Sequence, residues 1–289
     1  MVFVVVMHLS SEHESALAQI LQRSTSMPVE QVQERVKVKP NHVYVIPPGK
    51  TLKAANGYLA CADLTAERGR RIAVDLFFRT LADTHGPHAA AIVLSGADGD
   101  GAIGIKRIKE RGGLTIAQDP DEAEYGDMPR NSIATGLVDY VLPVVDIPKM
   151  VLEYHDRLSQ FSSDASRDIP APADSESFRQ IITLLRMRTG HDFANYKPST
   201  ILRRIERRLS LAGVGSLLEY ADFLQFHADE APALMKDLLI SVTNFFRDAD
   251  VFETLERTVV PRLFEHKRDD DPVRAWVAGC SSGEEAYTL

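Results

Sequence analysis

Short apolar runs alternate with amphipathic stretches along the first 158 residues of the chain. The apolar runs predict β-strands at residues 2–7, 42–46, 89–94, 114–117 and 137–142. The amphipathic stretches predict helices at residues 13–23, 71–84 and 102–111, the first opened by a capping box of Ser11 and Glu14. Strands that alternate with helices in this way indicate an α/β fold, with a parallel doubly wound sheet covered by helices on both faces.

The pattern changes after residue 158. Residues 159–177 are rich in Ser, Asp, Pro and Ala, which predicts a linker. Residues 178–264 are helical in pattern almost throughout and predict a small all-α domain. Residues 265–289 return to an apolar strand at 273–278, a glycine loop and a helix start, so they predict the first strand and loop of a second α/β domain.

The bulk composition narrows the class of protein. A net charge of −8 argues against binding nucleic acid with the whole surface. The two cysteines, Cys61 and Cys280, give neither a disulfide framework nor metal-ligand spacing, so we expect a reducing, cytoplasmic location and no metal site. The opening run MVFVVVM is too short to cross a membrane and lacks the flanks of a signal peptide, so we expect no membrane insertion.

Two predicted strands end on polar side chains. His8 follows the first strand, and Asp100 lies in the glycine loop after the third. Loops of this kind converge at the carboxyl edge of a parallel sheet, where a carboxylate can orient an imidazole and leave its other nitrogen as a base for a serine hydroxyl. The residues alone leave a structural alternative open: a histidine that merely ends a strand, and Asp98 or Asp100 as the cap of the helix that begins near Ala102.

The first 150 residues resemble the CheB-type chemoreceptor methylesterase domain. The resemblance is carried, in order, by VVVMHLSSEHES, VYVIPPGKTL, VLSGADGDGAIGIKRIKERGGLTIAQDP and YGDMPRNSIATGLVDYVLP. It implies that His8 is the histidine and Asp100 the aspartate of a catalytic triad, and that the backbone at Ala97 helps to bind the oxyanion. Asp98 stands where the family commonly has glycine, so the resemblance gives it only the place of a loop residue.

One departure from the family concerns the nucleophile. The family's serine lies in a G-x-S-x-G-G turn ahead of the histidine strand, and this chain begins after that point. Ser10 and Ser11 match nothing in that turn and are predicted to cap the following helix. We therefore expect the chain to be truncated at both ends and, as printed, inactive as an esterase.

A second glycine loop lies near the end of the chain. Residues 279–283, Gly-Cys-Ser-Ser-Gly, match the G-x-S-x-G nucleophile elbow formally, with Ser281 as the serine. Chain order rejects a hydrolase, because the acid and the histidine should follow the serine and no histidine does. A strand, glycine loop and helix start can instead let a nucleotide-like cofactor approach the backbone.

Residues from 178 onward resemble the first part of a CheR-type chemoreceptor methyltransferase. The matching stretches are RTGHDFANYKPSTILRRIERRL, LLISVTNFFRDADVFETL and VRAWVAGCSSGEEAY. The resemblance implies a helical domain followed by an incomplete S-adenosylmethionine site, in which Thr243, Arg247 and Glu285 would face the cofactor. Ser241 stands where some members have a cofactor-contacting asparagine, which puts that contact in doubt.

Basic residues are concentrated in the predicted helical domain. Arg203, Arg204, Arg207 and Arg208 recur at i, i+1, i+4 and i+5 and predict one cationic helix face. A solvated face is the ordinary explanation, and nucleic acid fits poorly because no aromatic residues are interleaved. The family resemblance implies docking of this face onto acidic chemoreceptor helices.

We interpret the sequence as a piece of a fused protein-glutamate methylesterase and methyltransferase of chemotaxis-type phosphorelay signalling. The expected domains are residues 1–158, the esterase; 159–177, the linker; 178–264, the helical domain; and 265–289, the start of the methyltransferase. Chemoreceptor helices are the expected partners. A response-regulator receiver or a histidine kinase module is a further candidate. S-adenosylmethionine is the expected cofactor of the transferase part, and none is expected for the esterase part. The alternative is a non-catalytic receptor-docking or regulatory module.

Overall fold

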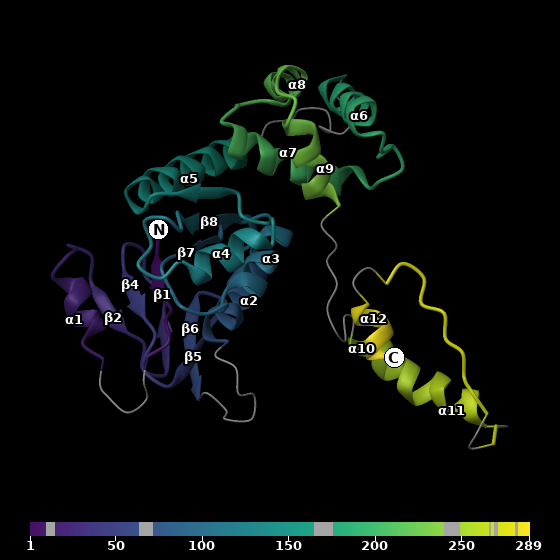
Figure 1. Ribbon diagram of the computed structural model, residues 1–289, viewed down its shortest axis with the longest axis horizontal. Helices are drawn as coiled ribbons and strands as arrows, with labels where there is room; N and C mark the ends of the chain where they lie inside the picture. Colours follow the sequence, from purple (N-terminus) through teal and green to yellow (C-terminus); the bar gives the residue numbers. More distant parts are fainter. Residues whose placement is uncertain are drawn as a thin grey trace. The chain divides into compact units, whose positions relative to one another are not determined.

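The structure is a computed structural model that describes residues 1–9, 15–63, 72–164, 176–239, 249–265, 267–268, 271–280 and 283–289. The chain divides into two compact units, Met1–Leu238 and Leu239–Leu289, which are treated separately below (Figure 1). In the part of the chain that the structure describes, no helix combines the length and the apolarity that crossing a membrane requires.

The strands of the first unit form sheets of two kinds. Their bounds are β1 (Phe3–Val5), β2 (Val29–Gln31), β3 (Arg35–Lys37), β4 (Val43–Val45), β5 (Lys50–Ala55), β6 (Tyr58–Asp63), β7 (Ala90–Val93), β8 (Leu114–Gln118) and β9 (Tyr140–Leu142). Two parallel sheets have the strand orders β1-β4-β2 and β7-β8-β9, and an antiparallel sheet has the order β3-β6-β5. The predicted α/β class is confirmed, but the described parallel strands lie in two sheets instead of one.

The antiparallel sheet was not expected from the apolar pattern. Its hairpin β5–β6 turns at Asn56 and Gly57, which both have positive φ, 43° and 79°. An Asn-Gly pair with positive φ at both positions is the type I′ turn that matches the twist of two antiparallel strands. The hairpin therefore has a sequence signal of its own, in a stretch where the apolar pattern gave none.

Helices cover the sheets of the first 164 residues. Their bounds are α1 (Leu17–Gln22), α2 (Ala73–His85), α3 (Ala102–Glu110), α4 (Asp127–Ala134) and α5 (Ile147–Asp164), with short 3₁₀ turns at Gly86–His88 and Val144–Asp146. The predicted helices at 71–84 and 102–111 are confirmed as α2 and α3. The capping box of Ser11 and Glu14 lies outside the described residues.

Helices α2 and α3 pack closely because a glycine lies between them. A Cβ at Gly104 would lie 2.6 Å from the Cβ of Phe78, a distance that packed atoms do not tolerate. Phe78, Ile105 and Ile108 are buried in one apolar core with Tyr44 of β4. This close packing holds the first turn of α3 against the first turn of α2, which positions the candidate site.

Four helices complete the first unit. Their bounds are α6 (Glu176–Thr189), α7 (Pro198–Ala212), α8 (Leu217–Phe226) and α9 (Glu230–Leu238), and they enclose a core that includes Ile181, Leu185, Ile205, Tyr220 and Leu224. In Figure 1, α5 lies between β8 and α7, and it contacts both. The predicted linker at 159–177 is helical at its edges, because α5 continues to Asp164 and α6 begins at Glu176.

The second unit contains short helices. Their bounds are α10 (Ala249–Thr254), α11 (Val260–Phe264) and α12 (Glu284–Thr288), with a π-helical segment at Leu255–Val259. The predicted strand at 273–278 is wrong, since these residues form no strand and Trp276 is 93% exposed. A strand requires a hydrogen-bonded neighbour, and the described residues of this unit offer none.

Candidate functional site

The structure brings His8 and Asp100 together. His8 follows β1, and Asp100 lies between β7 and α3, so the two residues come from different parallel sheets. The Nε2 atom of His8 lies 3.0 Å from Oδ2 of Asp100, and the two side chains are 19% and 0% exposed. This is the spacing of an imidazole and a carboxylate in charge contact.

Asp100 is fixed by the first turn of α2. Its Oδ2 accepts the backbone N–H of Val74 at 2.8 Å, and its Oδ1 accepts the backbone N–H of Asp75 at 2.9 Å. The first N–H groups of a helix lack partners within the helix and carry partial positive charge, so they favour a carboxylate there. The helix terminus thereby holds the Asp100 carboxylate in one orientation, facing His8.

A second carboxylate faces the same imidazole nitrogen. Oδ2 of Asp98 lies 3.4 Å from Nε2 of His8, and Oδ1 of Asp98 accepts the backbone N–H of Asp100 at 3.0 Å. The side chain of Asp98 is 39% exposed, whereas that of Asp100 is buried. Sequence reasoning left Asp98 out as a loop residue. The sequence does hold a signal for it: Asp98 lies two residues before Asp100, a spacing at which an aspartate side chain can accept the backbone N–H of the later residue.

Asp75 is a further buried acid that sequence reasoning missed. Its Oδ1 accepts the backbone N–H of Gly104 at 2.6 Å, which ties α2 to the first turn of α3. Burial raises the pKa of the Asp75 carboxyl, the bond from Gly104 opposes this, and the neighbouring Asp100 raises the pKa further. Asp75 thus holds the two helices in register beside the site. Ala97 is exposed in the same loop, and its role at the oxyanion stays a prediction.

The second predicted site falls mostly on residues that are not described. Thr243, Arg247, Ser241 and Ser281 all lie outside the described residues. Glu285 lies exposed in the first turn of α12, whose N-cap is Gly283. Gly279 and Gly283 have φ values of 70° and 98°, a conformation that favours glycine. The expected helix start is therefore present as α12, without the strand before the glycine loop.

The predicted cationic helix face is wrong for three of its four arginines. Arg204 and Arg207 are each 3% exposed, and Arg208 forms a double hydrogen bond to the carboxylate of Glu230 at 2.8 and 2.6 Å. Of the four, Arg203 is the one that is exposed. Tertiary packing explains the difference, because other parts of the first unit cover the side of α7 that carries Arg204, Arg207 and Arg208.

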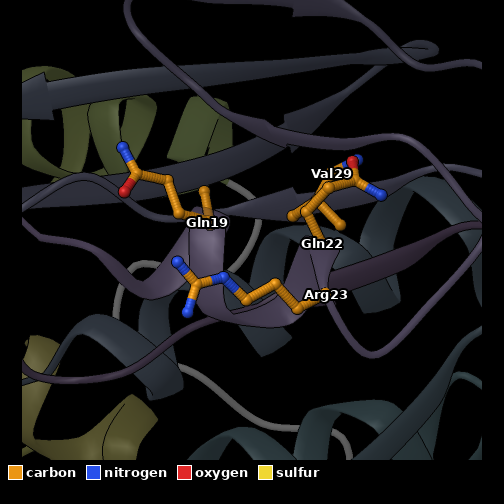
Figure 2. A pocket seen from close by; sticks show the side chains of 5 residues that line it. Gln19, Gln22, Arg23 and Val29 are labelled. Carbon is orange, nitrogen blue, oxygen red and sulfur yellow. The ribbon is translucent and has the colours of Figure 1, made fainter.

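A shallow open depression is lined by Ala18, Gln19, Gln22, Arg23 and Val29 (Figure 2). None of the predicted site residues lines it, and Gln22 already donates to two carbonyls and accepts the N–H of Val29. Across the described ranges, no group of His, Cys, Asp and Glu could hold a metal ion.

Comparisons with known proteins match three successive parts of the chain. The CheB methylesterase family model matches residues 1–151. The model of the all-alpha domain of CheR methyltransferase matches residues 176–239, and that of its SAM binding domain matches residues 241–289.

Individual relatives differ in how much they share with the chain. An uncharacterized 104.1 kDa protein of Rhodobacter capsulatus is 34% identical over 94% of this chain, which spans 31% of that protein. A putative protein-glutamate methylesterase/protein-glutamine glutaminase of Leptospira interrogans is 32% identical over 52% of the chain and 78% of its own length. The crystal structure of the Thermotoga maritima CheB methylesterase catalytic domain is 31% identical, with a TM-score of 0.47, over 52% of this chain and 82% of that one.

Proposed function

The chain belongs to the CheB methylesterase family and continues into CheR methyltransferase segments. On this basis we propose that, in a protein that also supplies the nucleophilic serine and the rest of the cofactor site, it serves to hydrolyse and form glutamate methyl esters on chemoreceptors. The proposal for the esterase half rests on one observation, the 3.0 Å approach of His8 to Asp100. An imidazole held by a buried carboxylate is the acid–base pair of a serine hydrolase.

In the proposed mechanism, His8 is the general base and then the general acid. Its Nε2 faces the two carboxylates, so Nδ1 takes the proton of a serine hydroxyl as the serine oxygen bonds to the ester carbon. The imidazolium, stabilised by Asp100, then gives this proton to the departing methanol oxygen. Water attacks the acyl-enzyme by the same proton transfers, which releases the glutamate carboxylate and regenerates the serine.

The transferase half is proposed to take its methyl group from S-adenosylmethionine. Glu285 is exposed in the first turn of α12, and nothing lies within 4 Å of the position that a Cβ would take at Gly279. A carboxylate there suits a cofactor that carries positive sulfonium and ammonium groups. We assign Thr243, Arg247 and Glu285 to this site by the family match. A substrate glutamate is already an anion near neutral pH, so these residues would align it and exclude water instead of activating it.

The esterase proposal predicts release of methanol from a methylated chemoreceptor. The protein to use is the present chain extended upstream of Met1 by a G-x-S-x-G-G turn. We expect methanol, measured by gas chromatography, to appear with this protein and to disappear when His8 is replaced by glutamine. The same extension with alanine in place of its serine is the matched control. If the extended protein binds the receptor and releases no methanol, the chain is a docking module.

A further inference from the structure

Arg204 of α7 ends on the backbone of the esterase domain. Its Nη1 donates to the carbonyl oxygen of Lys109 at 3.0 Å, and its Nη2 donates to that of Glu110 at 2.9 Å. These carbonyls belong to the last turn of α3, which carries partial negative charge, and that of Lys109 also accepts the backbone N–H of Gly112. The guanidinium of Arg204 therefore caps a helix of the other domain.

Arg207, one turn further along α7, enters a buried cluster of charges. Its guanidinium donates to Oδ2 of Asp237 at 2.6 Å, to Oδ2 of Asp139 and to the carbonyl oxygen of Gly113 at 3.1 Å. Lys109 contacts the same two aspartates, at 3.0 Å for Asp139 and 3.3 Å for Asp237. Each domain supplies one cation and one anion, and the four side chains are between 1% and 6% exposed.

The charges in this cluster balance, which is what allows them to be buried. Burial alone would raise the pKa of Asp139, but Arg207 and Lys109 outweigh it and hold that pKa below its ordinary value. Asp139 is also fixed within the esterase domain, because it accepts the backbone N–H and the hydroxyl of Thr115. A cation missing from either domain would leave a buried aspartate without compensation.

Apolar and neutral contacts continue along the end of α7. Leu211 packs against the apolar cluster of Leu114, Ile116, Ile147 and Tyr154 in the esterase domain. The hydroxyl of Tyr140 donates to the carbonyl of Leu211 at 2.8 Å, and Arg157 of α5 donates to the carbonyl of Ser210 at 2.9 Å. The contact between the domains thus includes ion pairs, hydrogen bonds and apolar packing, as specific protein interfaces do.

We propose that the partner of the basic face of α7 is the esterase domain of its own chain. The guanidinium groups of Arg204 and Arg207 are buried and hydrogen-bonded in this interface. They are therefore inaccessible to an acidic partner while the two domains are in contact. One side of the interface lies in the part of the chain that matches the CheB family model, and the other lies in the part that matches the CheR all-alpha domain. Neither match says that the two parts contact each other. The proposal rests on the contacts between the domains and not on either catalytic activity.

The first test is hydrogen exchange across the interface in the full chain. Arg204→Glu places an acid against the last carbonyls of α3 and removes both hydrogen bonds that the guanidinium donates to them. We expect it to speed amide exchange at residues 109–115 by about tenfold or more, because hydrogen bonds from a charged donor are among the stronger ones. The affected amides belong to the other domain, so a local effect within α7 would not produce this result. Arg203→Glu makes the same charge change at the exposed neighbouring position and should leave residues 109–115 unchanged. Equal exchange in the two variants would overturn the proposal.

The second test asks whether opening the interface frees the arginines. Lys109→Glu breaks the cluster from the esterase side and leaves α7 intact. We expect this variant to bind poly-L-glutamate at least about tenfold more tightly than the unchanged chain at low salt, although it is itself more negative. Lys106→Glu, with the same charge change on the same helix, should bind no better than the unchanged chain. Equal binding by the two variants would refute the proposal. If Lys109→Glu loses amide protection in β4 and α2, Lys109→Gln and Lys106→Gln carry the same comparison.

Discussion

Replacing Asp100 by asparagine in the serine-carrying extended protein should slow methanol release by about 10⁴-fold, as loss of the orienting acid does in a serine hydrolase. The Asp100 carboxylate has three donors around it: the N–H groups of Val74 and Asp75, and the ring of His8. An asparagine side chain has one acceptor oxygen and one NH₂ group, so it cannot serve all three. It would leave the imidazole with the partly exposed Asp98 carboxylate alone and a buried N–H without its acceptor.

The partly exposed neighbour of Asp100 provides the matched control for this prediction. Asp98→Asn removes one charge at a similar distance from His8 and leaves the buried carboxylate in place. We expect it to slow methanol release much less than Asp100→Asn does, because the buried carboxylate still orients the imidazole. Rates are compared by methanol release across a range of pH, with circular dichroism to show that both variants are folded. If Asp100→Asn retains a tenth or more of the rate, Asp100 is not the orienting acid.

Replacing Arg207 by methionine should lower the free energy of unfolding by about 3–5 kcal/mol. The variant removes one of two cations from a buried cluster and leaves Asp139 and Asp237 with Lys109 alone. Urea denaturation followed by circular dichroism measures this loss. Arg203→Met, at the exposed position next to Arg204, should stay within about 0.5 kcal/mol of the unchanged chain.

The dependence on pH gives a second measure of the same change. The pKa of Asp139 is lowered in the folded chain, so the stability it contributes is complete above the unfolded carboxyl pKa and is lost as the pH falls through the folded one. In Arg207→Met the pKa of Asp139 should be lowered less, because its nearest cation is gone. The stability lost at acid pH through Asp139 should then be smaller than in the unchanged chain. Asp75 and Glu110 have raised pKa values, so their contributions to stability change with pH in the opposite direction. Both residues remain in the variant, so these contributions cancel when the variant is compared with the unchanged chain. An unchanged acid profile would contradict the assignment.

Much of the fold is predictable because its signals are local. Helices α2 and α3 follow from apolar spacing and from the glycines that end α3. The β5–β6 hairpin is indicated by its Asn56-Gly57 turn and not by the apolar pattern of the strands on either side. The strand expected at 273–278 failed for a different reason. Its apolar pattern was present, but a strand exists only where another strand pairs with it, and pairing is not a local property.

The sequence by itself determined helices α2 and α3 and the position of His8 and Asp100 at the ends of parallel strands. A period of apolar residues and the glycines after it act over a few residues, so they can be recognised along the chain. Only the tertiary structure decided that Asp98 also faces His8 and that Arg204 and Arg207 face the esterase domain instead of solvent. Burial of a charge depends on which distant group arrives to compensate it, and that partner is chosen by packing.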